Sequence, residues 1–265
     1  TWEAPHWHVG ADGHNWDMFG SKAGSWQISA AQGIQQLRDA LPGFNAYAGQ
    51  WNVHFDQVAA SVSNVALDWS NQWTDWHIYQ RLSQILDAES SIHFANSTSA
   101  RYAQWFDWGK RALHANRGAA GIDGCLSTAV GDALANPDRP VILLTGDTAW
   151  LYDSNGLALR PIPSNIKIIV INNGGGNIFR WIEGPAEEVV LKRYFESPFA
   201  ESMKGSAMQL GVEYAVADNW QEFDVSFDSW YNNAGPSLLE IRTSGEEAAH
   251  FYEALKTCLS SKRIR

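Results

Sequence analysis

Two apolar segments that each end in a short polar turn constrain the fold of this chain more than any other feature. Val141–Leu144 is followed by Thr145-Gly146-Asp147-Thr148, and Ile168–Ile171 is followed by Asn172-Asn173-Gly174-Gly175-Gly176. Asp147 and Asn173 lie 26 positions apart, about the length of one strand–helix–strand crossover. We therefore expect both turns at the same edge of a parallel sheet, which is where such sheets bind ligands.

Composition excludes several classes of function. A chain of 265 residues can bury a full core as one large domain or two. Its formal net charge of −10 makes nucleic acid and anionic membrane surfaces poor partners. The two cysteines, Cys125 and Cys258, have no metal-ligand neighbours in the sequence, which indicates a reducing, cytoplasmic location. No stretch approaches the about 20 apolar residues of a membrane-spanning helix, so we expect no membrane insertion.

The pattern of elements changes near residue 66. Residues 1–66 are rich in tryptophan, glycine and histidine and contain one clear amphipathic helix, around Ala30–Leu41, so we interpret them as the remnant of another domain. Residues 67–265 alternate strands with helices, which predicts an α/β doubly wound parallel sheet. The expected strands are 91–95, 141–145, 167–171, 214–217 and 237–243, and the expected helices are 74–86, one ending near 135, 151–159, 202–210, 221–232 and 246–261. Since the chain begins Thr1-Trp2, we expect it to be a piece of a longer one.

Each polar turn has an ordinary structural explanation when it is taken alone. Asp147 can cap the helix that follows it, and Asn172-Asn173 can simply form a turn. Oxygen-bearing side chains at the ends of two neighbouring strands, beside glycine amides, instead suit a divalent cation that carries a diphosphate. The two turns together favour this second interpretation.

The pair of turns resembles the cofactor motif of thiamine-diphosphate-dependent enzymes, in which Gly-Asp is followed by Asn-Asn one crossover later. The resemblance implies thiamine diphosphate as cofactor and a Mg²⁺ or Mn²⁺ ion held by Asp147, Asn173 and the backbone carbonyl of Gly175. It also implies that the diphosphate takes backbone amides from Gly146, Thr148 and Ala149. Thr148 stands where many members of the family have a second glycine, a position that varies among them.

Three blocks resemble the menaquinone-pathway branch of that family: Ala95–Arg101, Asn116–Gly124 and Asn172–Phe179. The resemblance implies that Ser97, Arg101 and Arg117 bind substrate carboxylates, for which bidentate guanidinium groups are well suited. Without it, both arginines would be assigned to surface or structural ion pairs. It further implies that Ile122 wedges the cofactor into a bent shape and that the cofactor and substrate wall includes Gly176, Asn177, Ile178 and Phe179. Simple core packing explains Ile178 and Phe179 equally well.

The same resemblance implies a reaction and an assembly. Members of this branch decarboxylate 2-oxoglutarate and add the resulting succinyl unit to isochorismate, as homodimers or homotetramers. Residues 1–66 would be the end of a middle domain and 67–265 the diphosphate-binding domain. The family's N-terminal pyrimidine-binding domain, whose glutamate activates the cofactor, does not occur in these residues. We therefore expect the chain alone to be inactive and to bind thiamine diphosphate weakly.

Two other functions remain open on the residues alone. A different thiamine-dependent carboligase or decarboxylase, such as an acetolactate-synthase-like enzyme, would explain Asp147 and Asn173 but not the Arg117–Gly124 block. A flavodoxin-type phosphate-binding module without catalytic activity would explain the sheet. It would not require two oxygen-bearing side chains at neighbouring strand ends.

Overall fold

The computed structural model describes residues 4–14, 17–40, 45–68, 71–182, 184–196, 198 and 202–260. The chain divides into two units, Thr1–Ala60 and Ser61–Arg265. In the first unit, the parallel strands β1 (His6–Val9) and β2 (Lys22–Trp26) precede helix α1 (Ala30–Ala40). Helix α2 (Asn45–Asp68) begins in the first unit and ends in the second. Among the described residues, every helix is too short or too polar to cross a bilayer.

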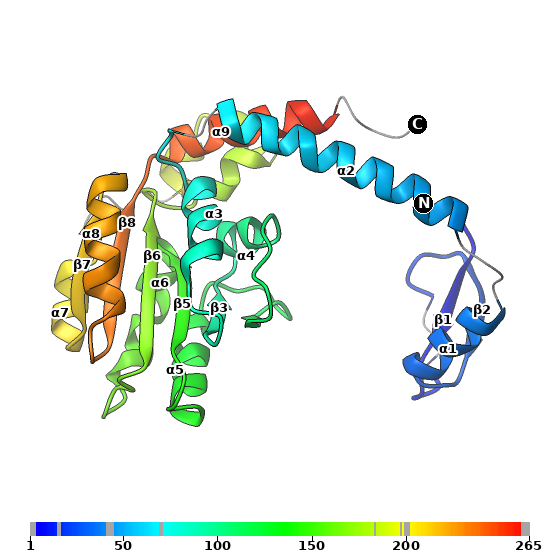
Figure 1. Cartoon of the computed structure of the whole chain (residues 1–265), viewed down its shortest axis with the longest axis horizontal. Coiled ribbons are helices and arrows are strands. Elements are labelled where there is room, and N and C mark those ends of the chain that lie inside the picture. The colour runs from blue at the N-terminus through cyan, green and yellow to red at the C-terminus, as the bar shows by residue number, and fades with distance from the viewer. Residues whose placement is uncertain are drawn as a thin grey trace. The chain divides into compact units, whose positions relative to one another are not determined.

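A six-stranded parallel sheet organises the second unit, with the strand order β4-β3-β5-β6-β8-β7. Figure 1 labels β3, β5, β6, β8 and β7 of this sheet. The strands are β3 (Ser91–Phe94), β4 (Ala112–Ala115), β5 (Val141–Gly146), β6 (Ile166–Asn172), β7 (Glu213–Ala217) and β8 (Ser237–Arg242). All of β6 and nearly all of β5 is buried. Continuous burial of this kind is typical of central strands in a sheet that is covered on both faces.

Helices cover both faces because successive residues of a strand point to opposite sides of the sheet. Ile142 and Leu144 pack with α3, α4, α8 and α9, whereas Val141 and Leu143 pack with α5, α6 and α7. The bounds of these helices are α3 (Asp75–Ile85), α4 (Thr98–Ala103), α5 (Cys125–Ala135), α6 (Asp147–Asp153), α7 (Lys204–Leu210), α8 (Trp220–Tyr231) and α9 (Gly245–Ser260). The predicted α/β doubly wound parallel sheet is confirmed.

The direction of winding reverses between β3 and β5. From β3 the chain crosses to β4 at one edge of the sheet, returns to β5 on the other side of β3, and continues to β6. Loops that leave neighbouring strands at such a switch point diverge, and the space between them is the usual ligand site of doubly wound sheets. The segments after β3, β5 and β6 therefore lie where a ligand is expected.

Some elements differ from those that the sequence pattern predicts. The pattern predicts neither β4 nor α4, because β4 is a largely exposed edge strand without apolar alternation and α4 has only six residues. The helix expected over 151–159 begins at Asp147, whose own carboxylate accepts a hydrogen bond from the backbone amide of Thr148. It continues as a 3₁₀-helix over Ser154–Ala158.

Candidate functional site

A cavity of about 290 Å³ lies at the carboxyl edge of the sheet, beside the ends of β3, β5 and β6. Most of the residues predicted for the site line this cavity: Ser97, Ile122, Gly146, Asp147, Thr148, Ala149, Asn173, Gly175, Gly176, Asn177, Ile178 and Phe179. The structure thus brings together residues from three strand ends that are far apart in sequence. Arg101 and Arg117 do not line the cavity.

The carboxylate of Asp147 is buried at the end of β5, with only 2% of the residue exposed. Its Oδ2 accepts hydrogen bonds from the backbone amides of Gly174, at 3.0 Å, and Gly175, at 2.8 Å. Burial raises the pKa of Asp147 to about 6, although these donors act in the opposite direction. No basic side chain of the described residues pairs with it. A buried carboxylate with only neutral donors is well placed to gain a cation.

Positive φ angles in the glycine loop make this arrangement possible. Gly174 has φ +87° and Gly175 has φ +125°, values that side-chain-bearing residues rarely adopt. In this conformation the amide of Gly175 faces Asp147, while its carbonyl accepts a 2.8 Å hydrogen bond from the backbone amide of Asn177. Since a carbonyl oxygen has two lone pairs, that carbonyl keeps one for a further ligand.

Asn173, at the end of β6, is held by a buried carboxylate that is distant in sequence. Its Nδ2 donates a 2.7 Å hydrogen bond to Oδ2 of Asp75, and Oδ1 of Asp75 accepts one of 2.5 Å from Thr243 Oγ1. Asp75 is 1% exposed, and burial raises its pKa above the usual value. Its position in the first turn of α3 gives no signal of this contact, because acidic residues are common there.

The carboxamide of Asn177 is buried and has no hydrogen-bond partner among the described residues. The residue is 4% exposed, and neither Nδ2 nor Oδ1 is satisfied. It lines both the main cavity and a neighbouring one of about 180 Å³. An unsatisfied buried polar group costs about 1–3 kcal/mol, so native proteins rarely keep one without a role. A polar ligand in the cavity would satisfy it, and with the Asp147 carboxylate the site fits a diphosphate and its divalent cation.

The two predicted arginines lie next to residues that line the cavity. Arg117 Nη1 donates to Oδ1 of Asn96 at 2.8 Å, and Arg101 Nη1 donates to the carbonyl of Ser97 at 2.9 Å. Both side chains are exposed. Ser97 itself has φ +69°, an unusual value for a residue other than glycine, and such strain is concentrated at ligand sites.

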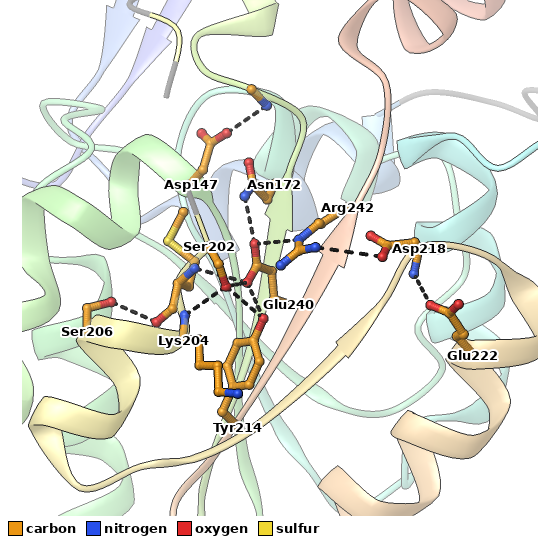
Figure 2. A network of polar contacts seen from close by, with 12 residues as sticks. Asp147, Asn172, Ser202, Lys204, Ser206, Tyr214, Asp218, Glu222, Glu240 and Arg242 are labelled. Atoms are coloured by element: carbon orange, nitrogen blue, oxygen red, sulfur yellow. Dashed lines mark hydrogen bonds and ion pairs between the residues drawn. The ribbon is translucent and has the colours of Figure 1, made fainter. Parts of the chain in front are cut away.

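Glu240 on β8 is the centre of a buried polar network (Figure 2). Its Oε1 accepts from Asn172 Nδ2 at 2.7 Å, and its Oε2 accepts from Tyr214 Oη at 2.5 Å and from the backbone amide of Met203 at 3.0 Å. Together with an ion pair to Arg242, these donors hold the pKa of Glu240 below its usual value despite burial. The network fixes the end of β6, where Asn173 follows.

Glu196, at the end of a π-helix (Leu191–Glu196), closes one side of the cavity. Its carboxylate forms a two-point ion pair with Arg180, in which Arg180 Nη2 lies 3.1 Å from Oε2. Its backbone carbonyl accepts a 2.7 Å hydrogen bond from the amide of Gly176. The contacts of Glu196, Glu240 and Asp75 arise only on folding, and no local motif marks them in the sequence.

Comparisons with known proteins agree with this geometry. Residues 95–241 match the profile of the thiamine pyrophosphate enzyme family, C-terminal TPP binding domain. A 2-succinyl-5-enolpyruvyl-6-hydroxy-3-cyclohexene-1-carboxylate synthase of Christiangramia forsetii is 38% identical over 173 residues, covering 64% of this chain and 30% of the relative. The synthase of the same name from Microcystis aeruginosa is 31% identical over 253 residues (91% and 43%). That from Cytophaga hutchinsonii is 29% identical over 264 residues (98% and 46%).

A solved structure supports the fold. A protein from Mycobacterium smegmatis, described as a thiamin diphosphate-dependent enzyme, has a TM-score of 0.51 and 20% identity, and the match covers 64% of this chain and 32% of that one. The chain spans less than half the length of the curated relatives named above.

The residues that line the cavity fall within the segment that matches the family profile. Asp147, Asn173 and Asn177 all lie within the matched segment, which is more than half of the chain. The resemblance to thiamine-diphosphate-dependent enzymes is therefore confirmed. This chain belongs to the thiamine pyrophosphate enzyme family, and residues 95–241 are its C-terminal TPP-binding domain.

Proposed function

We propose that this chain is the cofactor-binding part of a 2-succinyl-5-enolpyruvyl-6-hydroxy-3-cyclohexene-1-carboxylate synthase. Such an enzyme would decarboxylate 2-oxoglutarate and add the succinyl unit to isochorismate, with thiamine diphosphate and Mg²⁺ or Mn²⁺ as cofactors. The proposal rests on one observation above all: the cavity joins Asp147, Asn173 and the unsatisfied Asn177 at the switch point of the sheet. The shared name of the curated relatives supports the choice of reaction.

In this proposal, the chain's own residues bind the cofactor and its divalent ion and orient them. Asp147, Asn173 Oδ1 and the free lone pair of the Gly175 carbonyl would hold the divalent ion, and backbone amides of Gly146–Ala149 would face the diphosphate. Ile122, which lines the cavity and packs against the sheet, would support the cofactor from the side. Bound thiamine diphosphate supplies the carbanion chemistry, and the protein supplies placement and electrostatics.

The substrates of this reaction are carboxylates, for which the exposed guanidinium groups at the rim are suited. Arg101 and Arg117 each donate a hydrogen bond to a residue of the cavity wall, Ser97 and Asn96 respectively. A guanidinium held by one neutral acceptor keeps several donors for a carboxylate. We therefore assign Ser97, Arg101 and Arg117 to substrate binding.

We also propose that these residues work as part of a longer protein. The curated relatives are more than twice as long as this chain, so residues outside it would complete the active site. The chain alone would then have no activity and little affinity for thiamine diphosphate, and the full-length protein would be a cytoplasmic homodimer or homotetramer.

The test uses the full-length protein. Titration calorimetry should detect thiamine diphosphate binding that requires Mg²⁺ or Mn²⁺, and mass spectrometry should detect the succinyl adduct of isochorismate when 2-oxoglutarate is added. Acetolactate formed from pyruvate alone would assign the chain to a different carboligase. Binding that does not depend on a divalent ion would favour a phosphate-binding module without catalytic activity.

A further inference from the structure

We propose that Asp75 is a positioning residue that fixes which end of the Asn173 carboxamide faces the divalent ion. The inference rests on the proposed function, because it assigns a task to a residue behind the proposed metal site. Asp75 lies outside the segment that matches the family profile.

The contact itself selects one orientation of Asn173. Asp75 Oδ2 lies 2.7 Å from Asn173 Nδ2. A carboxylate can only accept hydrogen bonds, so it pairs with the NH₂ end of a carboxamide and repels the oxygen end. Because both ends branch from the same carbon, Oδ1 of Asn173 must then point away from Asp75. That oxygen is the atom that a hard divalent cation can bind.

Asp75 is itself anchored to the same turn by Thr243. The hydroxyl of Thr243 donates to Asp75 Oδ1 at 2.5 Å, and its backbone amide donates to the carbonyl of Asn172 at 3.0 Å. Thr243 directly follows β8, the neighbour of β6 in the sheet. Asp75, Thr243 and the Asn172-Asn173 turn therefore form a closed set of contacts in which the carboxylate cannot swing away.

A purely structural role would not require a carboxylate here. Asp75 is 1% exposed and forms no ion pair with any described residue, so its charge is costly to bury. An asparagine of the same shape could bond to Thr243 and Asn173 at a lower desolvation cost. However, an asparagine at position 75 could form these bonds with the Asn173 carboxamide in either orientation. Only a carboxylate fixes which end of that carboxamide faces it.

The first test is Asp75→Asn in the full-length protein, with Mn²⁺ affinity measured by electron paramagnetic resonance in the presence of thiamine diphosphate. Residues that orient metal ligands typically contribute about 10- to 100-fold in metal affinity, and we expect a loss in that range. The matched control is Asp153→Asn, since Asp153 is also buried and accepts from two neutral donors, both of Ser127, at 2.7 and 2.8 Å, so its contacts do not involve Asn173. The control should bind Mn²⁺ as the wild type does.

A second test exchanges the two partners. Asn173→Asp alone places two carboxylates against each other and should bind Mn²⁺ poorly. In the double variant Asp75→Asn with Asn173→Asp, the new carboxamide can donate to the new carboxylate, which leaves an oxygen for the ion. Mn²⁺ affinity should then exceed that of either single variant. If Asp75 had only a structural role, the exchange would restore stability but not Mn²⁺ affinity. Thermal unfolding of all four proteins measures stability separately.

The outcomes separate the inference from the function on which it rests. If the wild type binds thiamine diphosphate with Mn²⁺ and Asp75→Asn binds both equally well, the proposed function stands and the role of Asp75 is overturned. An exchange variant no better than its single variants also overturns that role. If the wild type binds no thiamine diphosphate with any divalent ion, the proposed function fails first.

Discussion

The carboxylate of Asp147 joins the end of β5 to the glycine loop after β6, with 2.8 Å between its Oδ2 and the backbone nitrogen of Gly175. The amide of Gly174 donates to the same oxygen at 3.0 Å. A cation bound at Asp147 would compete with these amides for that oxygen. Cation binding and the conformation of the glycine loop would therefore be coupled through a single side chain.

The first prediction concerns the pH dependence of stability without divalent ions. Because burial raises the pKa of Asp147 to about 6, the folded state holds this proton more tightly than the unfolded state does. The resulting stabilisation is full below pH 4 and is lost as pH rises through about 6, for a total of about 3 kcal/mol. Urea denaturation should show that Asp147→Asn gains stability relative to the wild type between pH 4 and pH 7. A constant difference across that range would contradict the prediction.

The second prediction concerns the unsatisfied carboxamide of Asn177. Asn177→Leu removes two buried polar atoms without partners, so the protein without ligand should be as stable as the wild type or more stable, by up to about 2 kcal/mol. The same variant should bind thiamine diphosphate at least tenfold more weakly in the full-length protein. Thermal unfolding and titration calorimetry measure the two effects. Loss of stability together with unchanged binding would assign Asn177 to the core.

The third prediction concerns the network around Glu240. In the wild type, the Glu240 carboxylate is surrounded by hydrogen-bond donors. Glu240→Gln replaces one carboxylate oxygen by an NH₂ group, so at least one of these hydrogen bonds is lost in a fully buried site. We expect a loss of about 2–3 kcal/mol in the free energy of unfolding, measured by urea denaturation. Tyr214→Phe removes one donor only and should cost less. Equal stability of Glu240→Gln and the wild type would show that the network contributes little.

The fourth prediction separates substrate binding from cofactor binding. Arg117→Ala in the full-length protein should raise KM for a carboxylate substrate at least tenfold, because a charge-assisted pair contributes about 1.5–3 kcal/mol. The affinity for thiamine diphosphate should not change, since Arg117 does not line the cavity. Steady-state kinetics and calorimetry test the two parts. Arg81→Ala, which removes an exposed arginine that pairs only loosely with Asp224 at 3.8 Å, is the control.

The sequence predicts those parts of the molecule that local pattern determines. The continuous apolar runs of β5 and β6 identify buried parallel strands, and their spacing places Asp147 and Asn173 at one edge. The helical bounds of α3 and α9 agree with expectation to within about one residue.

What the sequence does not predict depends on contacts between distant residues. Asp75 meets Asn173 across 98 positions, and Asn172 meets Glu240 across 68. Buried polar partners of this kind have no periodicity and no motif. The exposed edge strand β4 has no pattern either. The roles of Arg101 and Arg117 in substrate binding stay predictions, because the cavity wall does not include them.

The two-sided packing of β5 and β6 has a consequence for how such a protein can diversify. The aliphatic residues of these strands each pack into one helical layer or the other, so substitutions among them disturb a core. Most of the residues that line the cavity stand beyond the strand ends, in short segments attached to that rigid frame. New substrate preferences can therefore arise by exchange of these segments at little cost to folding.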